Sequence, residues 1–272
     1  MYHLITEYVT ACLWERGGRE RNEDALTVVC IRTVNKPVLL AAVADGVGGL
    51  SHGDAAASYI ISEIRKSFIR YTQDTVSPNS DNLKHIFLRT LYSCHRHIRE
   101  HDLITIKGQS GPDTTAKSAS TVSLICLIGN KGIYIHSGDS RLYKINRSFK
   151  RPSGSLHPAG KDHIDSKGRL LRCIGTGAYH KPEIRRIRVK KGRALLLCTD
   201  GFYRKADELS LTKLASCANE EALTALLSKI SDENKKQGER DNQSAVVIKL
   251  RDDPKNNRKN NAGHKENKGG SL

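Results

Sequence analysis

Four acidic residues stand where apolar runs of the sequence begin or end. Asp45 follows the run VLLAAVA, Asp139 follows GIYIHSG, Asp200 follows ALLLCT, and Asp241-Asn242 comes shortly before SAVVIKL. A single Asp-Gly pair is also typical of an ordinary turn, so one example carries little weight. The recurrence at run after run indicates that these carboxylates meet if the strands share one end of a sandwich.

Converging carboxylates oppose one another's ionisation unless a cation neutralises them, so this pattern predicts a metal site. The ligands would be oxygen atoms, and the sequence offers no cysteine pair at ligand spacing and no histidine cluster near these positions. Oxygen ligands favour a hard cation, Mg²⁺ or Mn²⁺, over Zn²⁺. A neighbouring glycine, such as Gly46, permits a tight turn and lets a backbone carbonyl approach the ion.

A charged segment at residues 17–24, GGRERNED, precedes the first of these runs. Glu23 and Asp24 are adjacent carboxylates, and Arg19 could bind a phosphate through two parallel hydrogen bonds. A charged surface turn would have the same composition, and spacing alone does not separate the two readings.

Apolar and β-branched residues predict strands that alternate with a few amphipathic helices. The turn at Gly129-Asn130-Lys131-Gly132 indicates a hairpin, which favours antiparallel pairing. The helices are expected at 54–70, 81–99, 206–217 and 219–231. The strands are expected at 26–31, 38–44, 121–128, 132–137, 141–145, 184–189, 194–199 and 244–250. Helices outside packed sheets follow from this order.

The composition predicts one domain over residues 1–250 and a solvated polar tail over 251–272. The formal charge is +16, yet only 5% of the residues are aromatic. A stacking platform for bases is therefore hard to build, and we expect no nucleic-acid partner but a basic surface that attracts acidic or phosphorylated protein. A basic nucleic-acid-binding protein with incidental acidic turns is the alternative from another class.

Compartment follows from three further features. No apolar run approaches the roughly 20 residues that span a bilayer, and the first residues lack the layout of a secretory signal. The seven cysteines are odd in number and lie mostly in apolar runs, as reduced thiols do. We expect a cytoplasmic, monomeric protein.

In their order, these motifs resemble the metal-dependent serine/threonine protein phosphatases of type 2C, the PPM family, in its compact bacterial form. Five segments carry the resemblance: Arg19-x-x-Asn22-Glu23-Asp24-Ala25, Val43-Ala44-Asp45-Gly46-Val47-Gly48-Gly49, Ser120-Thr121 with His136-Ser137-Gly138-Asp139-Ser140-Arg141, Leu196-Leu197-Cys198-Thr199-Asp200-Gly201, and Asp241-Asn242. The resemblance implies an α+β fold, a four-layer αββα sandwich of two antiparallel β-sheets flanked by helices.

The resemblance also implies roles for single residues. Asp45 would bridge two divalent cations, Mn²⁺ or Mg²⁺, and the Gly46 carbonyl would bind one of them. Asp200 and Asp241 would bind the other, and Asp139 a weaker third ion. Glu23 and Asp24 would hold the surrounding water, and Arg19 the substrate phosphate.

The implied reaction is hydrolysis of phosphoserine or phosphothreonine in proteins by a solvent molecule held between the metals, and the partners would be substrates of a serine/threonine kinase. Position 47 is Val, where many eukaryotic relatives have a proton-donating His, so water or another residue must protonate the leaving group. A catalytically inactive relative that binds phosphoproteins or regulators is the alternative, and the complete set of carboxylates favours activity.

Overall fold

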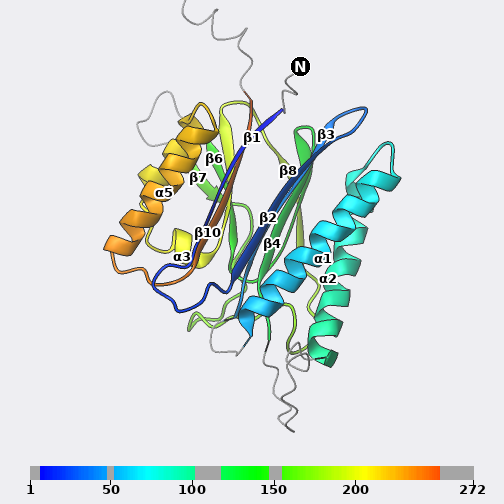
Figure 1. The fold of residues 1–272 in the computed structure, drawn as a ribbon, viewed down its shortest axis with the longest axis horizontal. Helices are drawn as coiled ribbons and strands as arrows, with labels where there is room; N and C mark the ends of the chain where they lie inside the picture. Colours follow the sequence, from blue (N-terminus) through cyan, green and yellow to red (C-terminus); the bar gives the residue numbers. More distant parts are fainter. Residues whose placement is uncertain (1–6, 48–51, 102–117, 147–154, 252–272) are drawn as a thin grey trace, which may run out of the picture.

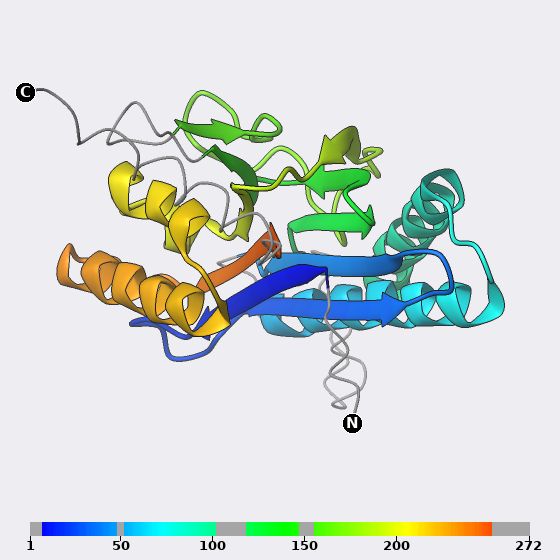
Figure 2. The same cartoon turned by 90° about the horizontal axis from the view of Figure 1, so that it is seen from above.

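The computed structural model describes residues 7–47, 52–101, 118–146 and 155–251. Two five-stranded antiparallel sheets pack face to face, with helices on both outer sides (Figures 1 and 2). This arrangement confirms the predicted four-layer αββα sandwich. The predicted tail lies outside the described residues, apart from Arg251.

The first sheet has the strand order β1-β10-β9-β6-β7 and is called the β1 sheet here. Its strands are β1 (Tyr8–Glu15), β10 (Gln243–Leu250), β9 (Arg193–Cys198), β6 (Arg141–Asn146) and β7 (Ser155–Pro158). The second, the β2 sheet, has the order β2-β3-β4-β5-β8. Its strands are β2 (Asp24–Arg32), β3 (Pro37–Asp45), β4 (Val122–Ile128), β5 (Lys131–Ser137) and β8 (Glu183–Arg188).

Two long helices, α1 (Gly53–Asp74) and α2 (Ser80–His101), cover the outer face of the β2 sheet (Figure 1). The short α3 (Asp200–Tyr203) and α4 (Glu208–Lys213), a 3₁₀ turn (Leu214–Ser216) and α5 (Glu220–Lys236) cover the β1 sheet. Asn219 begins α5 as predicted, because its side chain accepts a hydrogen bond from the Ala222 N–H.

Strand β3 shows why the central strands read as continuous apolar runs. Its residues alternate between two buried faces: Leu40 and Ala42 pack against the helices, while Leu39 and Val43 pack between the sheets. A strand buried on both faces has no polar face, so its sequence lacks the alternation of apolar and polar residues that is typical of a half-exposed strand.

Two strands and two helical segments differ from the predictions, and one of these is α3, which was not predicted and has only 4 residues. Strand β1 was missed because one of its faces is partly exposed, which leaves residues such as Trp14 in solvent. Strand β7 was missed because it has only 4 residues. The helix predicted at 206–217 is instead α4 followed by the 3₁₀ turn.

Candidate active site

The strand ends that carry the predicted carboxylates meet at one end of the sandwich. There they surround a pocket of about 150 Å³. Its lining includes five acidic residues: Glu23, Asp45, Asp139, Asp200 and Asp241. Arg19, Gly46 and Val47 also line it. The sequence pattern therefore predicted a real convergence, built from both sheets.

The pairing of β2 with β3 places two carboxylates opposite each other. Asp24 is the first residue of β2 and Asp45 the last of β3, and they are direct partners in the antiparallel register. The Asp45 backbone is fixed on its other side, where its N–H donates to Thr121 Oγ1 (3.1 Å) and its carbonyl oxygen accepts from the Thr121 N–H (2.8 Å).

Glycine is required directly after this strand. A Cβ on Gly46 would lie 2.5 Å from the carbonyl carbon of Gly53 at the start of α1 and 2.8 Å from the Glu23 carbonyl oxygen. The backbone of α1 thus approaches the turn after Asp45 more closely than any side chain at position 46 allows.

Thr199, which precedes Asp200, connects the two sheets behind the pocket. Its hydroxyl donates to Asp24 Oδ2 (2.9 Å) and accepts from the Ser244 N–H (3.0 Å). Thr199 belongs to the β1 sheet side and Asp24 to the β2 sheet, so this one hydroxyl fixes the two halves of the carboxylate cluster relative to each other.

Asn242 fixes the segment that contains Arg19 and Glu23. Its Oδ1 accepts from the Glu23 N–H (2.8 Å), and its Nδ2 donates to the carbonyl oxygens of Arg16 (2.7 Å) and Arg21 (2.9 Å). The segment 17–24 is therefore part of the site and not a free surface turn.

Asp139 stands on a turn that has its own supports. Gly138 has φ +123°, a left-handed conformation that favours glycine. The carbonyl oxygen of Asp139 accepts a hydrogen bond from the Tyr203 hydroxyl (3.1 Å). Arg141 lies over the Tyr203 ring, 3.9 Å from its centroid, and binds Asp162 through two nitrogen atoms. Arg141 thus supports the turn by joining β6 to the Asp162 carboxylate.

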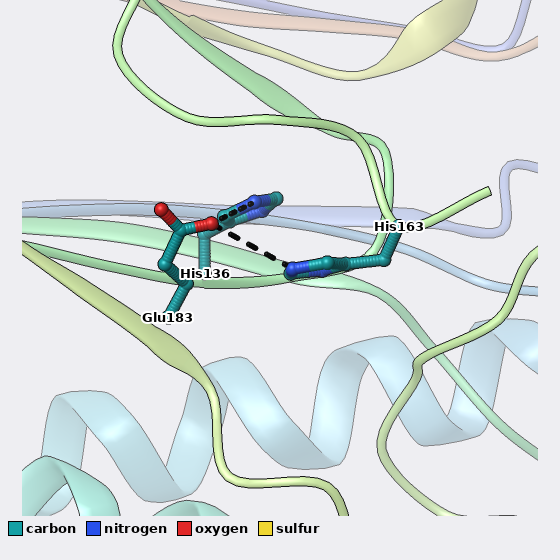
Figure 3. Close-up of side chains that lie close together, drawn as sticks. All are labelled: His136, His163 and Glu183. Atoms are coloured by element: carbon teal, nitrogen blue, oxygen red, sulfur yellow. Dashed lines mark ion pairs between the residues drawn. The ribbon is translucent and has the colours of Figure 1, made fainter.

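Histidines lie against this same turn, which corrects the expectation that no histidine cluster would be found near the carboxylates. The rings of His136 and His163 stack with centroids 4.5 Å apart, and Glu183 Oε2 faces both (Figure 3). One ligand atom from each of the three residues lies within 4.8 Å of the others. Loop 159–182 brings His163 here, a contact that no local pattern in the sequence reveals.

Hydrogen bonding argues that this cluster holds the turn and does not bind metal. His163 Nδ1 accepts from the Gly138 N–H (3.0 Å), so the proton of the neutral ring is on Nε2, the atom that faces Glu183. His136 Nε2 donates to the Lys161 carbonyl oxygen (3.0 Å). Burial lowers the pKa of both histidines, that of His163 to about 4, which keeps both rings neutral at pH 7. Neither Nε2 atom has a lone pair to offer an ion.

The acidic residues of the pocket are poorly neutralised by the protein. Burial raises the pKa of Asp45 well above its ordinary value, and repulsion from Asp24 and Asp200 adds to the effect. Burial raises the pKa of Asp24 to about 7, although the Thr199 hydrogen bond opposes the shift. Burial and repulsion from Asp139 raise the pKa of Asp200 to about 6. Burial raises the pKa of Glu23 and Asp139 as well.

Two arginines supply the positive charge nearest to the cluster. Arg19 Nη2 lies 3.0 Å from Asp241 Oδ1, and half of the Arg19 side chain is exposed at the mouth of the pocket. Arg204, which the sequence reading missed, contacts Asp200 and lies 3.8 Å from Asp241 Oδ2. The sequence indicated this contact through spacing alone, because Arg204 follows Asp200 by four residues, which is one helical turn.

The donor set fits hard divalent cations. The lining carboxylates supply only oxygen ligands, and the described residues of the lining include no cysteine or histidine. Their raised pKa values show that their charges lack sufficient compensation from the protein, which bound cations would provide. Asp24 lies behind the lining, so it is placed to support the others.

Comparison with known proteins gives the same picture. The sequence model described as "Protein phosphatase 2C" matches residues 16–245. The protein phosphatase PhpP of Streptococcus pneumoniae is 23% identical over 200 residues, which cover 68% of this chain and 74% of PhpP.

Solved structures share the fold. PppA, a key regulatory component of T6SS in Pseudomonas aeruginosa, superposes with a TM-score of 0.68 at 23% identity and covers 90% of this chain and 98% of its own. Serine/threonine phosphatase Stp1 from Staphylococcus aureus gives 0.71 at 16% identity, with 93% and 98% covered. The catalytic domain of phosphatase PstP, in complex with two manganese ions, gives 0.66 at 19% identity, with 90% and 99% covered.

A sandwich of two antiparallel sheets with a carboxylate cluster at one end is the architecture of the metal-dependent phosphatases. With most of its length matched, the chain belongs to the protein phosphatase 2C family. It is a protein phosphatase.

Proposed function

We propose that the carboxylate pocket is the catalytic centre for hydrolysis of phosphoserine and phosphothreonine in proteins, and that it holds two Mn²⁺ or Mg²⁺ ions. The observation that carries this proposal is the convergence of five acidic side chains from both sheets on one pocket. When bound, the metal pair supplies a solvent nucleophile at neutral pH and offsets the charge on the phosphoryl group.

Each predicted residue then has a task. Asp45 and the Gly46 carbonyl would hold the first ion, and Asp45 would also reach the second. Asp200 and Asp241 would hold the second ion, and Asp139 a third, weaker one. Glu23 would hold water next to the ions, and Asp24, which accepts a hydrogen bond from Thr199, would support that water.

Arg19 is placed to bind the phosphate. Its guanidinium is half exposed at the pocket mouth, and its contact with Asp241 aims it at the cluster. Its planar donors suit two phosphoryl oxygens at once. Val47, also in the lining, cannot transfer a proton, so water or another residue must protonate the departing serine or threonine oxygen.

The substrates are phosphorylated proteins, and we place the enzyme opposite a serine/threonine kinase. All seven cysteines are free, which supports a reducing compartment such as the cytoplasm. Among the described residues, no helix combines the length and the apolarity that a bilayer crossing requires. We propose a monomer as the working unit. We assign residues 1–250 to the phosphatase domain.

The test is hydrolysis of a phosphothreonine peptide with Mn²⁺, with EDTA, and by the variants Asp45→Asn and Asp200→Asn. Loss of an outer partner of a metal ligand costs about 10–100-fold, so loss of a ligand should cost more than about 100-fold. Asp232→Asn on the exposed face of α5 is the matched control and should keep full activity. Activity that survives chelation, or that both variants retain, would overturn the proposal.

A further inference from the structure

A second, larger hollow lies at the other end of β5 from Asp139. Its volume is about 960 Å³, and it is lined by the start of α2, the start of β5, strand β8 and parts of β6 and β9. We call it the basic hollow because its lining contains six cationic side chains: Lys84, Lys131, Lys144, Arg186, Arg188 and Arg193.

The charge of the basic hollow is not balanced within the part of the chain that the structure describes. Asp81 is the one acidic residue in its lining, and it pairs with Lys84 (3.0 Å). None of the other five cations forms an ion pair with a described residue. The hollow therefore concentrates positive charge and attracts anions.

The strand register adds a direct repulsion. Lys131 and Arg188 are opposite partners in the β5–β8 pair, so their side chains leave the same face of the sheet. Like charges directly opposite each other destabilise a sheet, and an anion between them removes that cost. Arg186 lies two residues along on the same face and adds a third charge.

The shape and lining favour a peptide over a nucleic acid. Ile133, Ile184 and Ile187 lie in the lining among the cations, and none of the described lining residues is aromatic, so the described part of the hollow offers bases no ring to stack on. Strand β8 ends its sheet and pairs only with β5 among the described strands, and an unpaired strand edge is a site where an extended peptide can add. Cations on an edge strand also discourage aggregation. That role does not account for Lys84 from α2 or for Lys144 and Arg193 from the other sheet.

We propose that the basic hollow is a docking site for an acidic, extended segment of a protein partner that alternates acidic and apolar residues. The role of the hollow in docking substrates rests on the proposed function. Its binding of an acidic peptide does not. Lys131 and Asp139 are separated along β5 and its turn by roughly 26 Å at 3.3 Å per residue. A docked substrate thus needs at least about eight residues between its acidic segment and its phosphate.

The experiment measures fluorescence anisotropy of a labelled, unphosphorylated 12-residue peptide of alternating Glu and Val. The wild-type enzyme should bind it, and Lys131→Glu with Arg188→Glu should weaken binding at least about tenfold. The control, Lys229→Glu with Lys236→Glu on α5, makes the same change of net charge elsewhere and should bind like the wild type. If both double variants lost the same affinity for the peptide, the net charge of the protein and not the basic hollow would explain binding, and the proposal would be overturned.

Two further arms separate other ligands and the proposed function. Tighter binding of a 12-nucleotide thymidine strand, or of phosphatidylserine vesicles, than of the peptide would overturn the assignment to a protein segment. The Lys131→Glu, Arg188→Glu variant should hydrolyse a short phosphothreonine peptide at the wild-type rate, which shows that it is folded. If hydrolysis fails in every form while peptide binding persists, the proposed function fails and the docking site stands.

Discussion

Replacing His163 tests whether the stacked histidines hold the Asp139 turn. The Gly138 backbone N–H donates to the ring atom Nδ1 of His163 (3.0 Å), and the His163 backbone N–H donates to the Gly138 carbonyl oxygen (2.9 Å). Gly138 is buried, so water cannot replace a lost acceptor without rearrangement. His163→Leu keeps much of the volume but removes the acceptor. His163→Asn restores an acceptor, Oδ1, close to the position of Nδ1.

The size of the effect follows from the buried donor. A buried N–H left without a partner costs about 1–3 kcal/mol, so His163→Leu should lose that much free energy of unfolding. If the turn must be ordered before Asp139 can bind an ion, the same free energy cost raises the dissociation constant for Mn²⁺ roughly 5–150-fold. His163→Asn should recover more than half of both losses.

Hydrogen exchange of the Gly138 amide in metal-free protein reads the hydrogen bond directly, and calorimetric titration with Mn²⁺ reads its consequence. Urea unfolding gives the stability of the three forms. Exchange at Gly138 that is equally slow in the wild type and in His163→Leu would refute the reasoning. Equal defects in the Asn and Leu variants would refute it too, because ring packing and not the acceptor would then be responsible.

Three other outcomes are expected. Thr199→Val should lower the stability of the protein by about 1–3 kcal/mol and raise the Mn²⁺ requirement, whereas Thr199→Ser should do neither in the same titrations, since it keeps the hydroxyl that Asp24 needs. Burial raises the pKa of Asp24 to about 7, so the folded protein takes up a proton there more readily than the unfolded chain, and the stability due to that proton is lost as pH rises through 7. In urea unfolding with EDTA present, the free energy of unfolding of Asp24→Asn should therefore increase relative to that of the wild type as the pH rises from about 5 to 8. A difference between the two proteins that does not change with pH would contradict the burial argument. Arg19→Lys should lower kcat/KM for a phosphopeptide by about 10–100-fold because a single ammonium replaces two parallel donors, with metal affinity near the wild-type value; an unchanged kcat/KM would remove Arg19 from phosphate binding.

The local sequence determined which elements form and which residues could bind metal. Apolar runs that end in acidic residues predicted the strands β3, β5, β9 and β10, since a strand buried on both faces needs an uninterrupted apolar stretch. The same pattern predicted that Asp45, Asp139, Asp200 and Asp241 meet, whereas the metal-site roles of Gly46, Glu23 and Asp24 came from the family resemblance. The structure places all seven at one end of the sandwich, where their individual roles stay predictions.

Only the tertiary structure decided what holds these residues in place. Thr199 reaches Asp24 across 175 residues of sequence, and His163 reaches Gly138 across 25, through hydrogen bonds that depend on how the sheets and loop 159–182 pack. Such contacts leave no periodic trace in the sequence, because each consists of one polar atom meeting another from a distant segment. The basic hollow likewise required the fold, which gathers cations from α2 and both sheets into one concave surface.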